Sequence, residues 1–192
     1  MLASTLKAVA IHTALDMEAV GPDYKTGWGL IQLDKAADLI KNTGNAHLLT
    51  EGKSTGNEQS ESLTNYSKLN EARMNRLDKT ITIEEVIAHK LQNLENHYIW
   101  LVLSEGWCGD AAQILPILNK MALSSNKKID LRIALRDENN DLMNQYLTNG
   151  GRAIPKVLII CKEAGIVRAD WGPRPTGASE LMTNYKRDFG VI

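Results

Sequence analysis

One stretch of the sequence, WLVLSEGWCGDAAQILP at Trp100 to Pro116, constrains the fold more than any other. Ile99 to Leu103 is apolar throughout and too short for a free-standing helix, so it predicts a strand buried on both faces. The chain turns at 104–106, and apolar residues then recur at helical spacing: Ala111, Ile114, Leu115, Leu118, Met121 and Ala122. The pattern therefore predicts a strand, a turn and a helix, with Cys108 at or just before the first helical turn.

This position matters for the chemistry of Cys108. The unpaired N–H groups and the dipole of a helix N-terminus favour an anion, and they lower the pKa of a thiol placed there. The carboxylate of Asp110, two residues on, would raise the same pKa if it lay close. The sequence leaves the sign of the net shift open.

Four stretches carry motifs: SEGWCGDAAQ, which lies within Trp100 to Pro116, and LNEARMNRLDKT, RDENNDLMNQYLTNGGRAIPK and WGPRP outside it. Together with a helix interrupted early by Pro116 and an Ile154-Pro155 pair that opens a later apolar strand, they resemble a group of bacterial thioredoxin-family proteins of unassigned role. The resemblance covers roughly Leu48 to the C-terminus. It implies a thioredoxin-like α/β fold in which Cys108 is the active-site residue.

The resemblance also implies a substrate groove beside Cys108, formed by Trp107, Gly109, Asp110, Arg152, Ile154 and Pro155. Pro155 would be cis and would shape the groove, although a plain strand-starting proline is an alternative. Trp107 would pack over the cysteine or serve only as a core residue. Arg152 would stabilise a thiolate or bind an anionic substrate, or else be an exposed loop arginine.

Ordinary thioredoxins carry a second cysteine three residues after the first, whereas this chain has Ala111 there. The other cysteine, Cys161, follows Pro155 in an expected strand. At about 3.3 Å per residue it would lie about 20 Å from Cys108, beyond disulfide reach. We therefore expect Cys161 to be a small core residue.

The remaining patterns predict further elements. Helices are expected at about 60–77 and 82–94, the second with a Thr82/Glu85 capping box, and at 140–147 and about 179–189. Strands are expected at 129–135, 156–161 and 166–171. From Ile99 the order is βαβαββα, which predicts two crossover units and a hairpin in a mixed sheet with helices on both faces.

The first residues differ from the remainder. LKAVAIHTA, GPDYKTGWGLI and KAADLI resemble the C-terminal end of the catalytic domain of subtilisin-like serine proteases over about forty residues. None of the three catalytic motifs is present, so we expect no serine protease activity and a structural or surface role for His12. Our hypothesis is that residues 1 to about 45 are a remnant of such a protease domain, left by a gene fusion or a misjoined reading frame.

Three parts follow from these patterns: a protease-like remnant at 1–45, a linker and helical segment at 46–98, and a thioredoxin-like core at 99–192. Residues 45–59, rich in Gly, Ser, Thr and Asn, are the expected linker or irregular lead-in. The resembling proteins continue beyond the final DFGVI, so truncation at the C-terminus is one interpretation of this end of the sequence.

Composition excludes several classes of partner. A net charge of -1 removes the electrostatic case for nucleic acid or an anionic membrane. No HExxH, paired CxxC or glycine-rich phosphate loop occurs, so no metal or cofactor is expected. Two cysteines suit a reducing compartment, which favours the cytoplasm.

The predicted function is monothiol chemistry at Cys108, with protein or low-molecular-weight thiols and disulfides as partners. The alternative is a redox-inactive module that holds a peptide in the groove around Trp107 and Pro155. A third possibility is a catalytically incomplete fragment of a subtilisin-like protease fused to this domain.

Overall fold

The computed structural model describes residues 45–190, which build one four-stranded sheet in the order β2-β1-β3-β4. The strands are β1 (Tyr98–Ser104), β2 (Ile129–Leu135), β3 (Lys156–Cys161) and β4 (Ile166–Trp171). β1 pairs with β2 in parallel, whereas β1 with β3 and β3 with β4 are antiparallel. The expected mixed sheet is confirmed. Only the connection from β1 to β2 is a parallel crossover, because β3 returns antiparallel instead of forming the second crossover that we expected.

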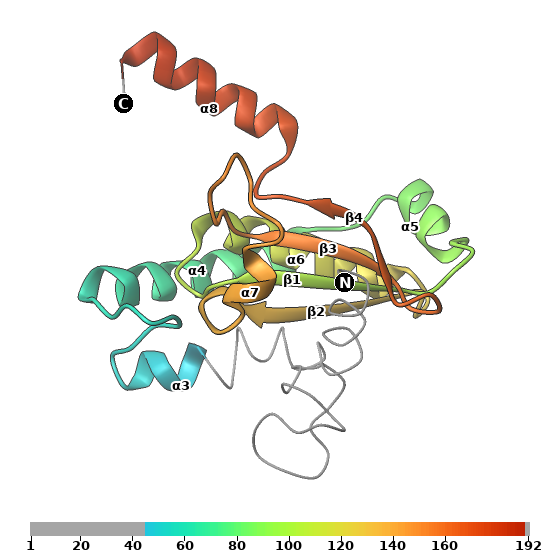
Figure 1. Ribbon diagram of the computed structural model, residues 1–192, viewed down its shortest axis with the longest axis horizontal. Helices are drawn as coiled ribbons and strands as arrows, with labels where there is room; N and C mark the ends of the chain where they lie inside the picture. Colours follow the sequence, from blue (N-terminus) through green and yellow to red (C-terminus); the bar gives the residue numbers. More distant parts are fainter. Residues whose placement is uncertain (1–44, 191–192) are drawn as a thin grey trace.

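The helices are α3 (Asn45–Thr50), α4 (Glu61–Thr80), α5 (Glu85–Gln92), α6 (Gly109–Ser124), α7 (Asn140–Met143) and α8 (Thr176–Phe189), with a 3-10 turn η2 (Arg136–Glu138). α4 and α5 pack against α6. In Figure 1, α6 lies behind the sheet and α7 lies in front of it. The expected helices on both faces are therefore present.

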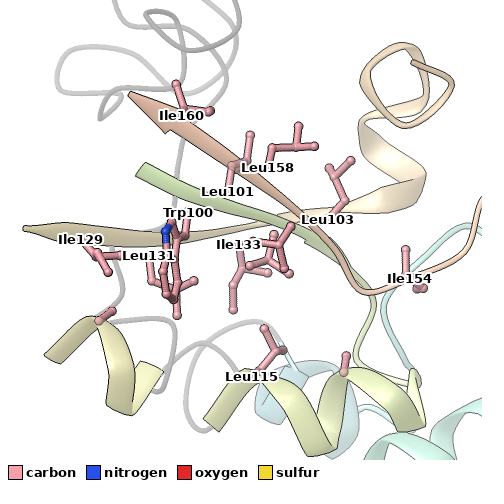
Figure 2. Close-up of a cluster of buried hydrophobic side chains, with 14 of the residues drawn as sticks. Trp100, Leu101, Leu103, Leu115, Ile129, Leu131, Ile133, Ile154, Leu158 and Ile160 are labelled. Carbon is pink, nitrogen blue, oxygen red and sulfur yellow. The ribbon is translucent and has the colours of Figure 1, made fainter. Parts of the chain in front are cut away.

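The strand β1 is the centre of the core. Its register places Trp100 and Val102 on the sheet face that carries Leu131 and Ile133. Figure 2 shows Trp100, Leu131 and Ile133 pointing toward Leu115 of α6, while Leu101 and Leu158 point to the opposite side. Residues 100 to 103 are all buried, as the uninterrupted apolar run predicts. Packing on both faces fixes the end of β1, from which the Cys108 turn starts.

Several local predictions are corrected. α6 continues through Pro116, which is buried inside the helix, because packing outweighs the loss of one helical hydrogen bond. The Thr82/Glu85 capping box is absent: α5 starts after Glu84, with no side-chain cap bond. α7 ends at Met143, four residues short of the expected end.

The segment 45–59, expected as a linker or irregular lead-in, has a defined course. It begins with the helix α3 and continues into a segment in which Ser54 and Thr55 are buried. The side-chain amide of Gln59 donates to the carbonyls of Ser54 and Gly56 at 2.9 and 3.0 Å. These hydrogen bonds explain why a stretch of linker-like composition has a defined course.

The two ends of the chain stand apart from this core. The protease-like remnant expected at 1–45 lies outside the described residues, apart from the first residue of α3, so it stays a prediction. α8 projects away from the sheet beyond β4 (Figure 1), and none of its residues is buried. Between residues 45 and 190, no helix has the length and apolarity needed to cross a bilayer.

Candidate functional site

Cys108 lies where the end of β1 meets the segment that leads into β3. It is the N-cap residue of α6, and its Sγ accepts a hydrogen bond from the Ala111 N–H at 3.4 Å. The thiol donates to the carbonyl oxygen of Ile154 at 3.3 Å, and the Ile154-Pro155 peptide bond is cis. The structure thus brings Cys108 together with Ile154 and Pro155, and it confirms the expected cis proline.

The surroundings of Cys108 settle the direction of its pKa shift. Only 7% of the residue is exposed, and this burial raises the thiol pKa above its ordinary value of 9.0. The N–H of Ala111 lowers the pKa and the carboxylate of Asp110 raises it, both with smaller effect than burial. The resting group at neutral pH is therefore a protonated thiol.

Asp110 does not face the thiol as an isolated charge. Arg174 forms two contacts with its carboxylate, Nε with Oδ1 and Nη2 with Oδ2, both at 2.8 Å. The hydrogen bond with Asp110 raises the pKa of Arg174. This bidentate geometry is the strong form of the arginine–carboxylate pair, so the charge of Asp110 is largely compensated.

Arg174 reaches the site because the segment after β4 runs directly against the cis proline. Gly172 has φ of +124°, and a Cβ there would lie 2.1 Å from the carbonyl oxygen of Pro155. Only glycine fits such a close approach. The WGPRP motif therefore supplies both the glycine that allows the contact and the arginine that pairs with Asp110, a role that sequence reasoning missed.

Trp107 precedes the cysteine and is covered by Arg136, whose Cζ lies 5.1 Å from the ring centroid. Arg136 also bonds Asp137 through Nε at 2.8 Å. Arg152 lies near the same carboxylate, at 3.8 Å, and donates to the side chain of Asn140. Arg152 therefore contacts the η2–α7 region rather than the sulfur of Cys108.

A buried carboxyl group supports the turn from beneath. Glu105 is 3% exposed, and its Oε1 accepts from the Asp137 N–H at 2.9 Å. Its Oε2 has no hydrogen-bond partner within the part of the chain that the structure describes. Burial raises the pKa of Glu105, against the opposing effects of the Thr55 hydroxyl and the Asp137 N–H.

The segment at 54–57 forms one wall of this site. The Thr55 hydroxyl accepts from the Gly106 N–H at 2.7 Å, and the Asn57 N–H donates to Asp137 at 3.4 Å. A Cβ on Gly56 would lie 2.8 Å from Asp137 Oδ2 and 3.4 Å from both Glu105 Oε2 and Trp107 Nε1. No local pattern in the sequence predicts these long-range contacts.

α4 supplies the opposite wall. Asn70 is fully buried and donates from its side chain to the Gly106 carbonyl at 3.0 Å. Arg73, one helical turn on, donates to Asn70 Oδ1 at 3.1 Å, and its Nη1 lies 3.6 Å from the position of a Cβ on Gly109. The basic residues of the LNEARMNRLDKT motif therefore include one that flanks the cysteine turn.

The site lacks the donor set of a metal centre. Among residues 45–190, no group of three or more His, Cys, Asp or Glu side chains is arranged to hold a metal ion. The predicted groove residues Trp107, Gly109, Asp110, Ile154 and Pro155 do lie around the cysteine turn, and Arg152 lies at its margin.

Two solved structures are similar to this chain. One is a protein of unknown function from Pseudomonas aeruginosa, at 22% identity and TM-score 0.49, covering 74% of this chain and 80% of that one. The other is an HIV epitope-scaffold, at 21% identity and TM-score 0.50, covering 78% and 86%. At this level of identity the likeness to the scaffold concerns the fold alone.

No curated protein matches the chain. A family model described as thioredoxin matches residues 56–186, which is more than half of the chain. This match and the mixed sheet confirm the expected thioredoxin-like α/β fold. The chain belongs to this thioredoxin family.

Proposed function

We propose that the protein is a monothiol member of this family, in which Cys108 exchanges with disulfides and is regenerated by an external thiol. The observation that carries the proposal is the placement of Sγ between the Ala111 N–H and the Ile154 carbonyl, at 3.4 and 3.3 Å, beside the cis proline. An N–H that already points at sulfur would stabilise a thiolate or a departing sulfur.

The exchange needs no second cysteine of this chain. The Cys108 thiol releases its proton to solvent, and the thiolate attacks one sulfur of a disulfide. The old S–S bond breaks as the new one forms, and the other half leaves as a thiolate that takes up a proton. A free low-molecular-weight thiol then attacks the mixed disulfide, releases Cys108 and is itself oxidised. Cys161 takes no part, since it lies at the opposite end of β3 from Pro155.

The proposal also includes a location and a set of partners. A chain with two free cysteines and a monothiol cycle that depends on external thiols suits a reducing compartment, so we propose the cytoplasm. The partners are protein or low-molecular-weight thiols and disulfides. The net charge of -1 gives no support for nucleic acid or an anionic membrane as a partner.

A second candidate is a redox-inactive module that holds a peptide against Pro155. The burial of Cys108, at 7% exposure, and its raised pKa favour this candidate. In the module the cysteine would be a packing residue, and the surface around Trp107, above the buried Pro155, would bind an extended segment through main-chain hydrogen bonds.

The two functions are separated by the reactivity of the thiolate itself. Cys108 in a Cys161→Ala variant is reacted with iodoacetamide and with hydroxyethyl disulfide across a pH series, in native buffer and in urea. Both functions predict native reaction rates that keep rising with pH beyond 9, because the pKa is raised. We then divide each rate constant by the fraction of Cys108 present as thiolate. For a monothiol protein, the corrected rate constant with the disulfide should be at least as large in native buffer as in urea. A native rate that is roughly a hundredfold slower at every pH would overturn the monothiol function and favour the binding module.

A further inference from the structure

Three arginines lie at the cysteine turn and a fourth lies at its margin, and each comes from a different part of the chain. Arg73 lies on α4, Arg136 in η2, Arg152 between α7 and β3, and Arg174 after β4. These segments meet at the end of the sheet where β1 runs into α6 (Figure 1). Since the whole chain has a net charge of -1, this convergence of cations is a local feature and not a consequence of composition.

The carboxylates of the site do not compensate all four cations. Asp110 pairs with Arg174, and Asp137 is shared between Arg136 and Arg152. Arg73 has a hydrogen bond to an Asn70 side-chain oxygen and no carboxylate partner between residues 45 and 190.

Glu105 is a third acid in contact with this region, through the Asp137 N–H. Even with Asp110, Asp137 and Glu105 all ionised, three carboxylates face four arginines. The turn therefore carries an excess of positive charge, and the charges of Arg136 and Arg174 already act on the Cys108 sulfur.

We infer that the cysteine turn selects small disulfides that carry carboxylate groups, with Arg73 as the principal binding cation. This inference rests on the proposed monothiol function and names its class of substrate. A guanidinium that has only a neutral partner can accept a carboxylate without first breaking an ion pair. The two faces of the turn offer cations on both sides, Arg73 beside Gly109 and Arg136 over Trp107.

The burial of the sulfur favours a small substrate over a protein. With 7% of Cys108 exposed, an approaching disulfide must enter between the cysteine turn and the segment of Ile154. A flexible low-molecular-weight disulfide can do so, whereas a disulfide held in a folded surface would bring bulky neighbours with it. Positive charge at the rim also raises the encounter rate of an anion, and salt screens that effect.

The test compares three disulfides that differ in charge. The full chain carrying Cys161→Ala is reacted with glutathione disulfide (anionic), hydroxyethyl disulfide (neutral) and cystamine (cationic), and the mixed disulfide on Cys108 is followed by intact mass. At about 20 mM salt we expect glutathione disulfide to react roughly tenfold faster than cystamine, after correction for the reactivity of each with a free thiol. Raising the salt to about 500 mM is expected to remove most of the preference.

Two variants locate the effect. Arg73→Gln keeps a side chain able to bond Asn70, and it is expected to reduce the preference for the anionic disulfide about threefold or more. Arg168→Gln is the matched control, because Arg168 is exposed on β4 and is not one of these four arginines. This variant should prefer the anionic disulfide as strongly as the parent chain does.

The outcomes separate the inference from the proposed function. Equal corrected rates for all three disulfides, or an equal loss in the Arg73 and Arg168 variants, overturn the anion selectivity and leave the monothiol function standing. Failure of Cys108 to react with any of the three disulfides, while the same chain reacts in urea, overturns the proposed function itself.

Discussion

The two cysteines of this chain are both buried, yet their surroundings differ in kind. Cys108 is 7% exposed and Cys161 is 2% exposed. The Cys108 sulfur accepts from a helix N-terminal N–H and donates to a carbonyl 46 residues away. Cys161 is the last residue of β3, and its Sγ contacts Glu163, two residues along the same hairpin, at 3.5 Å. Burial alone therefore says little about what a cysteine can do.

The larger difference is how each region is assembled. The Cys108 turn is held by contacts that span 36 residues to Asn70, 51 to Thr55 and, through Asp110, 64 to Arg174. Around Cys161, the backbone ladder of the sheet holds the chain: β3 pairs with β4, its neighbour in sequence, and with β1, where Tyr98 lies opposite Cys161. The site end depends instead on side-chain contacts between loops and helices outside this ladder, so changes to the backbone there should affect the chemistry most.

The largest expected effect comes from removing each thiol in turn. Cys108→Ala should abolish the mixed disulfide with glutathione disulfide, because the second cysteine lies at the other end of β3. Cys161→Ala should keep the rate within roughly twofold, since a buried cysteine acts as a small apolar residue. Intact-mass kinetics measure both. A Cys161→Ala variant that loses exchange while remaining folded would contradict the distinction between the two regions.

A glycine substitution tests the long-range assembly. Gly172→Ala would bring a Cβ to 2.1 Å from the Pro155 carbonyl oxygen, so the backbone must shift, and we expect a loss of about 3–5 kcal/mol in the free energy of unfolding.

The control is Gly150→Ala, where φ is +77° but no atom lies within 4 Å of the added Cβ. There only the left-handed backbone is penalised, by about 1–2 kcal/mol. Urea titration measures both variants. Equal losses would show that the segment after β4 is free to move away from Pro155.

The same contrast explains what could be predicted from the sequence. The predicted bounds of β2, β3 and β4 agree with the structure, because alternating or continuous apolar runs are local signals. The position of Cys108 at the start of α6 follows in the same way. The pairing of Arg174 with Asp110, and the support of the turn by Thr55 and Glu105, leave no local pattern, so sequence reasoning did not find them.

A smaller effect is expected from the buried acid beneath the turn. The raised pKa of Glu105 means that the stabilisation associated with its proton is complete below the ordinary value of 4.5 and is lost as the pH rises through the folded-state pKa. Glu105→Gln keeps the acceptor for the Asp137 N–H and replaces the unpartnered Oε2 by a donor. The variant should therefore be more stable than the parent by about 1–2 kcal/mol at pH 8.

The pH dependence provides the control for this variant. The difference in stability between the Glu105→Gln chain and the parent should shrink as the pH falls toward 4.5, because the parent carboxyl takes up its proton over that range. Urea titrations across pH 4.5 to 8 measure it. A variant that is less stable than the parent at pH 8 would show that the ionised carboxylate of Glu105 is well accommodated beneath the cysteine turn.

The smallest effect is expected at the Cys161 end, from His97→Gln. The pKa of Glu163 is lowered to about 2, first by the main-chain N–H of His97 and next by its ring; both contact Oε1, at 3.0 and 2.8 Å. The substitution removes only the ring, so Glu163 should titrate between about 2 and the ordinary 4.5. Both side chains are about half exposed, at 51% and 48%, so the free energy of unfolding at pH 7 should not change measurably.

Carboxyl titration by NMR measures the shift in the Glu163 pKa, and the rate of Cys108 alkylation, which should not change, is the control. A return of the Glu163 pKa to 4.5 would mean that the main-chain hydrogen bond forms only when the His97 ring holds the carboxylate. The hairpin around Cys161 would then depend on side-chain contacts, as the Cys108 turn does.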